Sequence, residues 1–210
     1  MARVAVFSLT FDPFIGGAEV AIAEIAKRLP THSCTLFTAR LRQNLPATET
    51  IGAVTVVRVG RGHAVDKFRY PWLAAKAAAR IHRQSPFGLV WGIMASWGGL
   101  AALRFKEKHP TIPYVLTEQS GDSDTFIARR TWFWRWRYRQ IYTRADTVTA
   151  ISKFLSERAK RYGGREVTVV PNGVDVARFS QRLSGDEWQR FRSQAHLTEG
   201  PYVITVSRLV

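Results

Sequence analysis

A pair of glycines stands near the start of the chain, where a strand pattern gives way to a helix pattern. Residues 11–19 read Phe-Asp-Pro-Phe-Ile-Gly-Gly-Ala-Glu, with the pair at Gly16 and Gly17. Glycine lets a backbone approach a phosphate closely, and a helix N-terminus offers free N–H groups and partial positive charge. The spacing is not that of the dinucleotide fingerprint, so a nicotinamide cofactor is not expected. The segment fits a phosphate-binding turn, or simply a tight turn between a strand and a helix.

Three further segments place polar residues where strands are expected to end. Ser152 precedes Lys-Phe-Leu and is of the type that caps helices, and residues 171–175 read Pro-Asn-Gly-Val-Asp, a turn signal. Residues 206–209 read Val-Ser-Arg-Leu and put Arg208 just after a strand pattern. Taken alone, a cap, a turn and a solvated surface charge explain these segments.

The stretch Phe126–Arg144 is both basic and aromatic, with six arginines and no acidic residue. Tryptophan at headgroup depth and arginine paired with phosphate are typical of helices at a membrane surface, and arginine also binds phosphorylated acceptors through two hydrogen bonds. A solvated crossover helix and a nucleic-acid surface are the alternatives, the latter without an accompanying motif. A second candidate surface lies within Arg58–Arg83. We expect the acceptor or membrane contact at Arg129, Arg130, Trp132, Trp134, Arg135, Trp136 and Arg137.

The overall composition is that of a globular domain with an unusual charge. The 210 residues are 46% hydrophobic, which argues against disorder, and 31 Lys and Arg against 16 Asp and Glu give a net charge of +15. Such a chain is drawn to polyanions. Cys34 is the single cysteine, so no intrachain disulfide is possible, and the scattered histidines predict no metal site.

Strand patterns alternate with helix patterns as far as Val170. This order predicts an α/β fold with a Rossmann-like parallel sheet and helices on both faces, and ligands at the carboxyl ends of the strands. The predicted strands are Arg3–Leu9, Ser33–Ala39, Val54–Val59, Leu89–Met94, Tyr114–Thr117, Thr147–Ile151 and Val167–Val170, and the predicted helices are Ala18–Leu29, Trp72–Arg83, Leu100–Lys108, Trp132–Arg144 and Lys153–Tyr162.

The pattern changes after Pro171. We predict a Rossmann-like domain over residues 1–175 and a linker over residues 176–200. A capping-box spacing at Ser184 starts a short helix in that linker. Residues 201–210 are predicted to begin a second, donor-binding domain that is absent from this sequence.

Five segments, in this order, make the chain resemble the N-terminal domain of a family 4 (group 1) retaining glycosyltransferase with a GT-B fold. The segments are GGAE at Gly16–Glu19, TEQSG at Thr117–Gly121, AISKFL at Ala150–Leu155, PNGVD at Pro171–Asp175 and VSRL at Val206–Leu209. Such enzymes have two Rossmann-like domains with the active site in the cleft between them. The resemblance implies that Gly16, Gly17 and Arg208 line the donor diphosphate site, and that Gly173 and Asp175 form part of the connection between domains.

The chain departs from the family pattern at Gln119, where the family commonly has histidine. Glutamine can hydrogen-bond a sugar hydroxyl but cannot exchange a proton near neutral pH. Glu118 is the nearest group that can titrate, so Gln119 and Glu118 are the candidate catalytic positions. The family's donor-binding lysine and pair of glutamates lie beyond Arg208, so we expect the 210 residues alone to be inactive.

The resemblance implies a hexosyltransferase-type enzyme of glycan or cell-envelope biosynthesis. It would move a sugar from a nucleotide-sugar to a lipid-linked or anionic glycan acceptor, with no metal, no cofactor and no nucleic-acid partner. The expected location is cytoplasmic, at the anionic inner face of the membrane. The alternative is a non-catalytic basic remnant of such an enzyme that binds a membrane or a partner.

Overall fold

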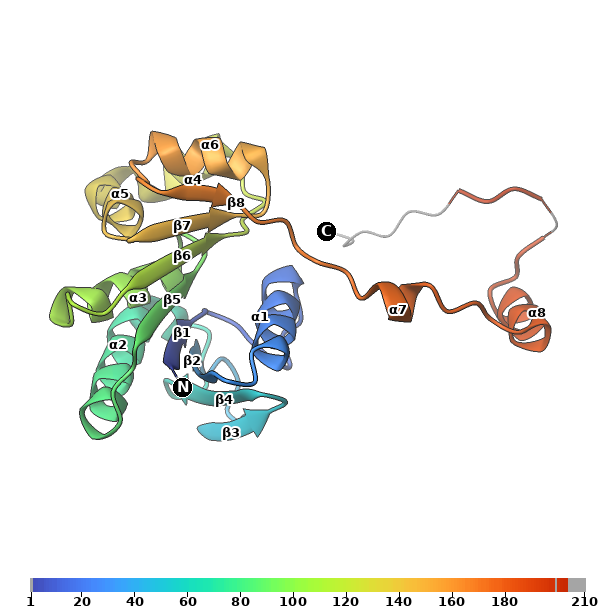
Figure 1. Cartoon of the computed structure of the whole chain (residues 1–210), viewed down its shortest axis with the longest axis horizontal. Helices are drawn as coiled ribbons and strands as arrows, with labels where there is room; N and C mark the ends of the chain where they lie inside the picture. Colours follow the sequence, from blue (N-terminus) through green and yellow to red (C-terminus); the bar gives the residue numbers. More distant parts are fainter. Residues whose placement is uncertain (1, 199, 204–210) are drawn as a thin grey trace. The chain divides into compact units, whose positions relative to one another are not determined.

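The computed structural model describes residues 2–198 and 200–203. Eight strands form one sheet in the order β3-β4-β2-β1-β5-β6-β7-β8 (Figure 1). Neighbouring strands are parallel throughout, except for β3 and β4. The predicted α/β fold with a largely parallel sheet is therefore confirmed. The strands are β1 (Arg3–Phe7), β2 (Ser33–Ala39), β3 (Thr48–Ile51), β4 (Val54–Val59), β5 (Leu89–Ile93), β6 (Tyr114–Glu118), β7 (Thr147–Ala150) and β8 (Val167–Val169).

The antiparallel edge strand β3 corrects the expectation of a wholly parallel sheet. It pairs with β4 through a turn in which Gly52 has a φ of 56°, a conformation that favours glycine. An edge strand pairs on one side only, and β3 carries the half-exposed sequence Thr-Glu-Thr-Ile. It therefore lacks the apolar run by which buried strands are recognised.

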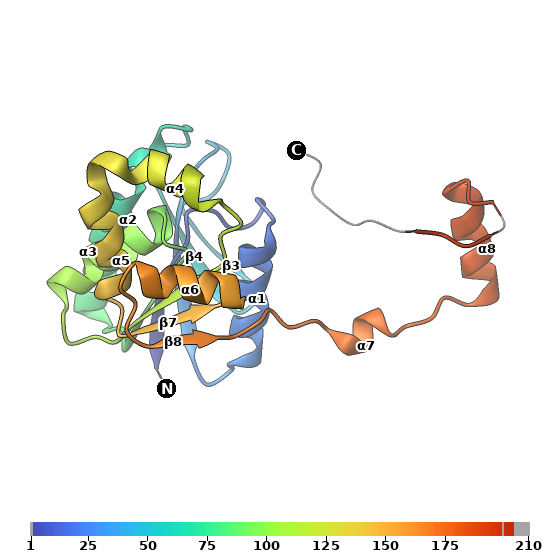
Figure 2. The same ribbon diagram turned by 90° about the horizontal axis from the view of Figure 1, so that it is seen from above.

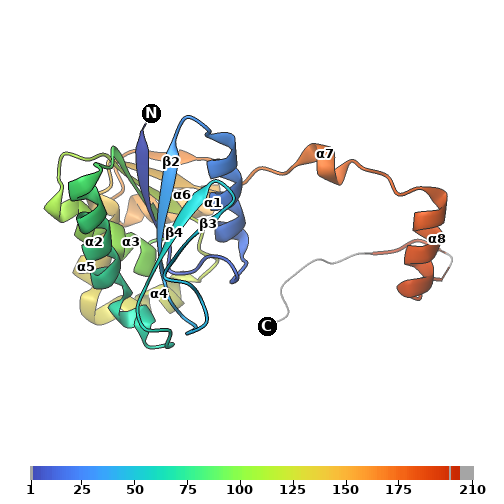
Figure 3. The same ribbon diagram turned by 90° about the horizontal axis from the view of Figure 1, so that it is seen from below.

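Helices cover both faces of the sheet, as predicted (Figure 3). On one face, Ile22 of α1 packs in a cluster with Val4 and Val6 of β1. On the other face, α2, α3 and α5 bury a cluster that includes Phe7 and Phe105. Figure 2 shows α6 alongside β7 and β8, which it contacts. The helices of this part are α1 (Gly17–Arg28), α2 (Asp66–Gln84), α3 (Trp97–Lys108), α4 (Asp124–Thr131), the short 3₁₀ helix η1 (Trp132–Trp134), α5 (Arg135–Thr143) and α6 (Lys153–Arg161).

The predicted helix Trp132–Arg144 is wrong in extent. The segment starts earlier, with α4, because the Ser123 hydroxyl accepts the N–H of Phe126 and caps that helix. At Trp134 the backbone leaves the helical region (φ −125°, ψ 25°), and α5 begins only at Arg135. A cap and a local backbone break, neither visible in the apolar spacing, thus divide the segment in two.

The N-terminal part of α2 also lies outside its predicted bounds. The helix begins at Asp66, whose Oδ2 accepts the N–H groups of Arg61, Gly62 and His63 at 2.7–3.0 Å. This carboxylate orders the β4–α2 loop and places six more residues in α2 than the apolar pattern predicts.

Residues from Gly173 onward form a second unit. It contains α7 (Val176–Phe179) and α8 (Gly185–Gln194). The predicted capping box is present, because the Ser184 hydroxyl accepts the N–H of Glu187 and the Glu187 carboxylate accepts the N–H of Ser184. Residues 204–206 of the predicted strand, and Arg208, lie outside the described residues.

No helix within residues 2–198 and 200–203 has the length and apolarity needed to cross a bilayer. The weakly charged stretch from Gln84 to Leu103 contains β5 and the first half of α3.

Candidate active site at the carboxyl end of the sheet

The turn between β1 and α1 presents the two glycines. Gly16 is the N-cap of α1, and no side chain of the turn caps the helix in its place. A Cβ added at Gly17 would meet no atom within 4 Å, so packing does not require a glycine there. Helix N-termini are suited to anionic ligands, and no side chain occupies this one as a cap.

Arg58 of β4 holds this turn from inside the protein. Its side chain is buried, and its Nη2 donates to the carbonyl oxygen of Asp12 at 2.6 Å. Its Nη1 contacts the carboxylate of Glu49. This role was not predicted from the sequence, although an arginine inside the apolar run Val-Thr-Val-Val-Arg-Val indicates that the side chain has a buried partner.

Glu118, at the end of β6, points into the interior. Its residue is 1% exposed, and its Oε2 accepts the Tyr142 hydroxyl at 2.7 Å and the Ala95 N–H at 3.2 Å. Burial raises the pKa of the Glu118 carboxyl above its ordinary value, and these hydrogen bonds offset only part of that effect. The carboxylate thus links β6 to the start of α3 and to α5. Gln119, the next residue, is half-buried.

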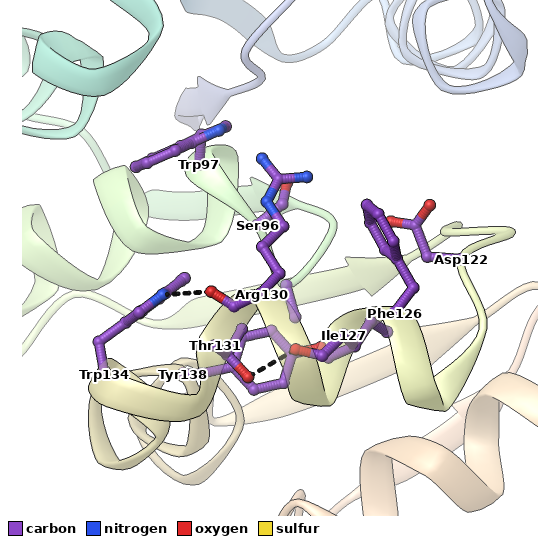
Figure 4. Close-up of a pocket in the computed structure, with 10 residues that line it drawn as sticks. Ser96, Trp97, Asp122, Phe126, Ile127, Arg130, Thr131, Trp134 and Tyr138 are labelled. Carbon is purple, nitrogen blue, oxygen red and sulfur yellow. Dashed lines mark hydrogen bonds between the residues drawn. The ribbon is translucent and has the colours of Figure 1, made fainter.

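A hollow opens between the N-terminus of α3 and the α4–α5 segment (Figure 4). Its interior space is only about 30 Å³, and a volume of about 350 Å³ is reached only when open solvent at its mouth is included. Strands β1, β5 and β6 are adjacent and parallel, so their carboxyl ends lie together. The hollow and the glycine turn both lie beyond these carboxyl ends. The residues that line the hollow are Ala95, Ser96, Trp97, Asp122, Phe126, Ile127, Arg130, Thr131, Trp134 and Tyr138.

The walls of the hollow are aromatic and carry one cation. Trp97 and Trp134 stack with ring centroids 6.4 Å apart, and the guanidinium of Arg130 lies 5.8 Å from the Trp97 ring and 5.9 Å from the Phe126 ring. The buried Nε1 of Trp97 makes no hydrogen bond with the described residues. Aromatic rings pack against apolar faces, and arginine binds carboxylate or phosphate. The lining therefore presents aromatic faces and one cation, beside Asp122 at the rim.

The buried Arg158 of α6 supports the rim of the hollow. Its Nε donates to the carboxylate of Asp124 at 2.7 Å, and its Nη2 donates to the carbonyl oxygen of Asp122 at 2.5 Å. Asp122 is itself a lining residue. An arginine that is 0% exposed thus fixes the β6–α4 loop and the first turn of α4.

The predicted acceptor residues fall into two groups. Arg130 and Trp134 line the hollow, together with Trp97 and Phe126, which sequence analysis did not select. Trp97 comes three residues after the predicted strand Leu89–Met94, near the position where ligands of such sheets gather, so its place along the chain was a usable signal. The others lie outside the hollow: Arg129, Trp132, Arg135 and Trp136 are exposed, and Arg137 is paired with Glu107 of α3.

No group of three His, Cys, Asp or Glu side chains within the described ranges is placed to hold a metal ion.

Residues 15–178 match the family model described as Glycosyltransferase Family 4. No curated protein matches the chain. Among solved structures, the chain is similar to two of sucrose-phosphate synthase from Thermosynechococcus elongatus. One has a TM-score of 0.72 at 16% identity, over 94% of this chain and 53% of that chain. The other, of twinned crystals, has a TM-score of 0.62 at 13% identity, over 93% of this chain and 98% of that chain. The chain spans about half the length of the former, and the likeness is one of fold.

Proposed function

The chain belongs to glycosyltransferase family 4, with the N-terminal part of a GT-B fold, and from this premise we propose that it is the acceptor-side domain of a retaining enzyme. The enzyme moves a sugar from a nucleotide-sugar to a lipid-linked or anionic glycan precursor, without a metal. One observation carries this proposal. An open glycine turn and an aromatic hollow that contains an arginine both lie beyond the carboxyl ends of the strands.

On the donor side, the proposal rests on the β1–α1 turn. The amides at Gly16 and Gly17 and the partial charge of α1 stabilise the negative charge that develops on the leaving diphosphate. Arg58 holds the turn through Asp12, so the amides are positioned before the ligand arrives. In the proposal, Arg208 adds a cation to the same diphosphate.

On the acceptor side, the proposal rests on the hollow. Trp97 and Trp134 give apolar surface to a sugar ring, and Arg130 pairs with a phosphate or carboxylate of the acceptor. The net charge of +15 favours an anionic acceptor and a place at the inner face of the membrane.

The proposal is tested with the native protein, captured from extracts of its source with an antibody against residues 1–210. Supplied with UDP- or GDP-sugars and membrane extract, it should release the nucleoside diphosphate, and release should depend on the extract. When the Arg130→Gln variant takes the place of the native protein in the cell and is captured in the same way, it should need more acceptor to reach the same rate. If no common UDP- or GDP-sugar is consumed, the proposal is wrong.

A second candidate function follows from Gln119, which stands where the family commonly has histidine. It is a non-catalytic basic domain that binds a membrane or a partner. The Gln119→His variant separates the two functions. A large gain in sugar transfer indicates a decayed site, whereas an unchanged or lower rate indicates that glutamine works in the native enzyme.

A further inference from the structure

The positive charge is concentrated in one layer of helices. Residues 66–84, 97–108 and 124–144 contain fourteen Lys or Arg against three Asp or Glu. That surplus of eleven accounts for most of the net charge of +15. These residues form α2, α3, α4, η1 and α5, of which α2, α3 and α5 lie side by side on one face of the sheet (Figure 3).

Helix α2 turns a continuous basic stripe toward solvent. Its exposed positions recur three or four residues apart, which places them along one side of the helix. The opposite side is buried and includes Tyr70, Ala74 and Ala78. We call the exposed set the α2 stripe: Arg69, Trp72, Lys76, Arg80 and Arg83.

Side-chain contacts connect the α2 stripe to α5 across α3. The guanidinium of Arg104 in α3 lies 4.4 Å from the ring of Trp72. Glu107, one turn further along α3, binds Arg137 of α5, with Nη2 to Oε2 at 2.7 Å. Burial, and after it the charge of Arg137, lower the pKa of the Arg104 guanidinium, although Glu107 opposes this effect. Positively charged side chains are therefore crowded at this point. An approaching anion relieves that crowding.

Large aromatic side chains project beside this basic layer. Trp132, Phe133 and Trp136 are 75%, 73% and 64% exposed, and they lie at η1 and the first turn of α5. We call these three residues the aromatic turn. They are exposed where α4 and α5 are joined, and Arg137 lies 5.6 Å from the ring of Trp136. Large apolar side chains that are exposed together are typical of interaction sites.

We propose that the α2 stripe and the aromatic turn together dock the protein on a bilayer rich in anionic phospholipids. The stripe binds headgroup phosphates, and the rings of the aromatic turn enter the interface between headgroups and acyl chains. Stable attachment to a membrane takes two such contributions, and the structure supplies both on one side of the sheet. This inference deepens the membrane association in the proposed function.

The docking surface adjoins the hollow. Arg130 and Trp134, which line the hollow, flank Trp132 and Phe133 of the aromatic turn along the chain. A lipid-linked acceptor thus reaches the hollow with its head group while its chains stay in the bilayer. Single-stranded nucleic acid would use the same cations and would stack its bases on these rings, and the test below separates it from a bilayer.

The test measures binding of the 210-residue chain to sedimented vesicles. Vesicles of phosphatidylcholine alone are compared with vesicles of equal parts phosphatidylcholine and phosphatidylglycerol. The first variant carries Lys76→Gln, Arg80→Gln and Arg83→Gln in the α2 stripe. Its matched control carries Lys27→Gln, Lys153→Gln and Arg165→Gln, which remove the same charge from exposed positions elsewhere. A second variant carries Trp132→Ser and Phe133→Ser.

Binding is expected only to the anionic vesicles. The stripe variant should bind about a hundredfold more weakly, at about a fivefold loss for each of the three cations removed, and the control should change little. The aromatic variant should bind about tenfold more weakly and should lose the blue shift of tryptophan fluorescence on vesicles. Circular dichroism should show all variants folded, since every substituted side chain is exposed.

Equal losses in the stripe variant and its control would overturn the docking surface, because binding would then follow net charge alone. A single-stranded oligonucleotide that binds as tightly as the vesicles, and is weakened equally by the aromatic variant, would also overturn it in favour of nucleic acid. Neither result bears on nucleotide release from nucleotide-sugars, so failure of the docking surface is distinguishable from failure of the proposed function.

Discussion

At the scale of single residues, two neighbours at the end of β6 have different surroundings. Glu118 is enclosed and bound to Tyr142 and Ala95, whereas Gln119 is half-buried at the edge where ligands of such sheets gather. A carboxylate held in this way acts on the position of α3 and α5 rather than on a substrate. Gln119 is thus the better placed of the two candidates for contact with a sugar hydroxyl.

We predict that Glu118→Gln changes the pH dependence of stability. Burial raises the pKa of Glu118 in the folded protein, so the stability linked to its bound proton is fully present below the unfolded value and is lost as the pH rises through the folded value. Glutamine keeps a side-chain oxygen that accepts the hydrogen bonds of Tyr142 and Ala95, and it carries no charge at any pH. The melting temperature of the variant, relative to wild type, should therefore rise from pH 4 to pH 8, and parallel curves would contradict this account.

We predict that Gly17→Asp separates folding from donor binding. The position has open space and lies in the first turn of α1, where a carboxylate favours the helix by about 0.3–1 kcal/mol. The melting temperature should stay level or rise slightly. The same carboxylate repels a diphosphate, so nucleotide release by the native enzyme should fall at least about tenfold, about 1.4 kcal/mol. Gly17→Ala is the control and should retain release.

At the scale of elements, β4 supports a loop that begins far from it in sequence. Arg58 reaches the carbonyl oxygen of Asp12 and the carboxylate of Glu49 from a position 5% exposed. The strand thus connects the sheet edge, β3, to the glycine turn at the start of α1. The Nη1 of Arg58 also donates to the carbonyl oxygen of Pro46 at 3.3 Å, and removal of the buried cation leaves all of these acceptors without it.

We predict that Arg58→Met lowers the free energy of unfolding by about 3 kcal/mol, the loss typical of breaking a buried pair from one side. Arg58→Lys keeps the charge but cannot reach these acceptors in one plane, so it should lose less. Urea unfolding followed by circular dichroism measures both variants. A loss of under about 1 kcal/mol for Met, typical of an exposed ion pair, would show that the arginine does not hold the turn.

At the scale of the whole molecule, like charges crowd one helical layer. The surplus of eleven positive charges on residues 66–84, 97–108 and 124–144 opposes folding through mutual repulsion, while it attracts anionic surfaces. Repulsion among these positive charges therefore lowers the free energy of unfolding as long as no anionic partner is bound.

We predict that moderate salt stabilises the protein. Raising the ionic strength from about 0.01 M to about 0.15 M shortens the screening length from about 30 Å to about 8 Å. Repulsion across α2, α3 and α5 should weaken, and the melting temperature should rise by about 3 °C. The variant with Lys76→Gln, Arg80→Gln and Arg83→Gln should start higher at low salt and rise less. A melting temperature that falls with salt would contradict this prediction.

The sequence by itself determined the features that depend on neighbouring residues. The alternation of strand and helix patterns predicted the α/β fold, and Gly16 and Gly17 marked the turn at the start of α1. The charge and the aromatic residues of 126–144 predicted an interaction surface, which stays a prediction. Each of these follows from local periodicity, capping or composition, so no knowledge of distant contacts was needed.

Only the tertiary structure decided which distant residues meet. It turned Glu118 inward, brought Arg58 to Asp12 across 46 positions of sequence, and joined Trp97 to Arg130 in the hollow. The physical reason is the strand order. Because β1 lies between β2 and β5, the chain must cross the sheet through α2 before β5 and β6 are added, and this crossing aligns loops that are far apart in sequence. The spacing of residues along the chain does not show which loops are aligned in this way.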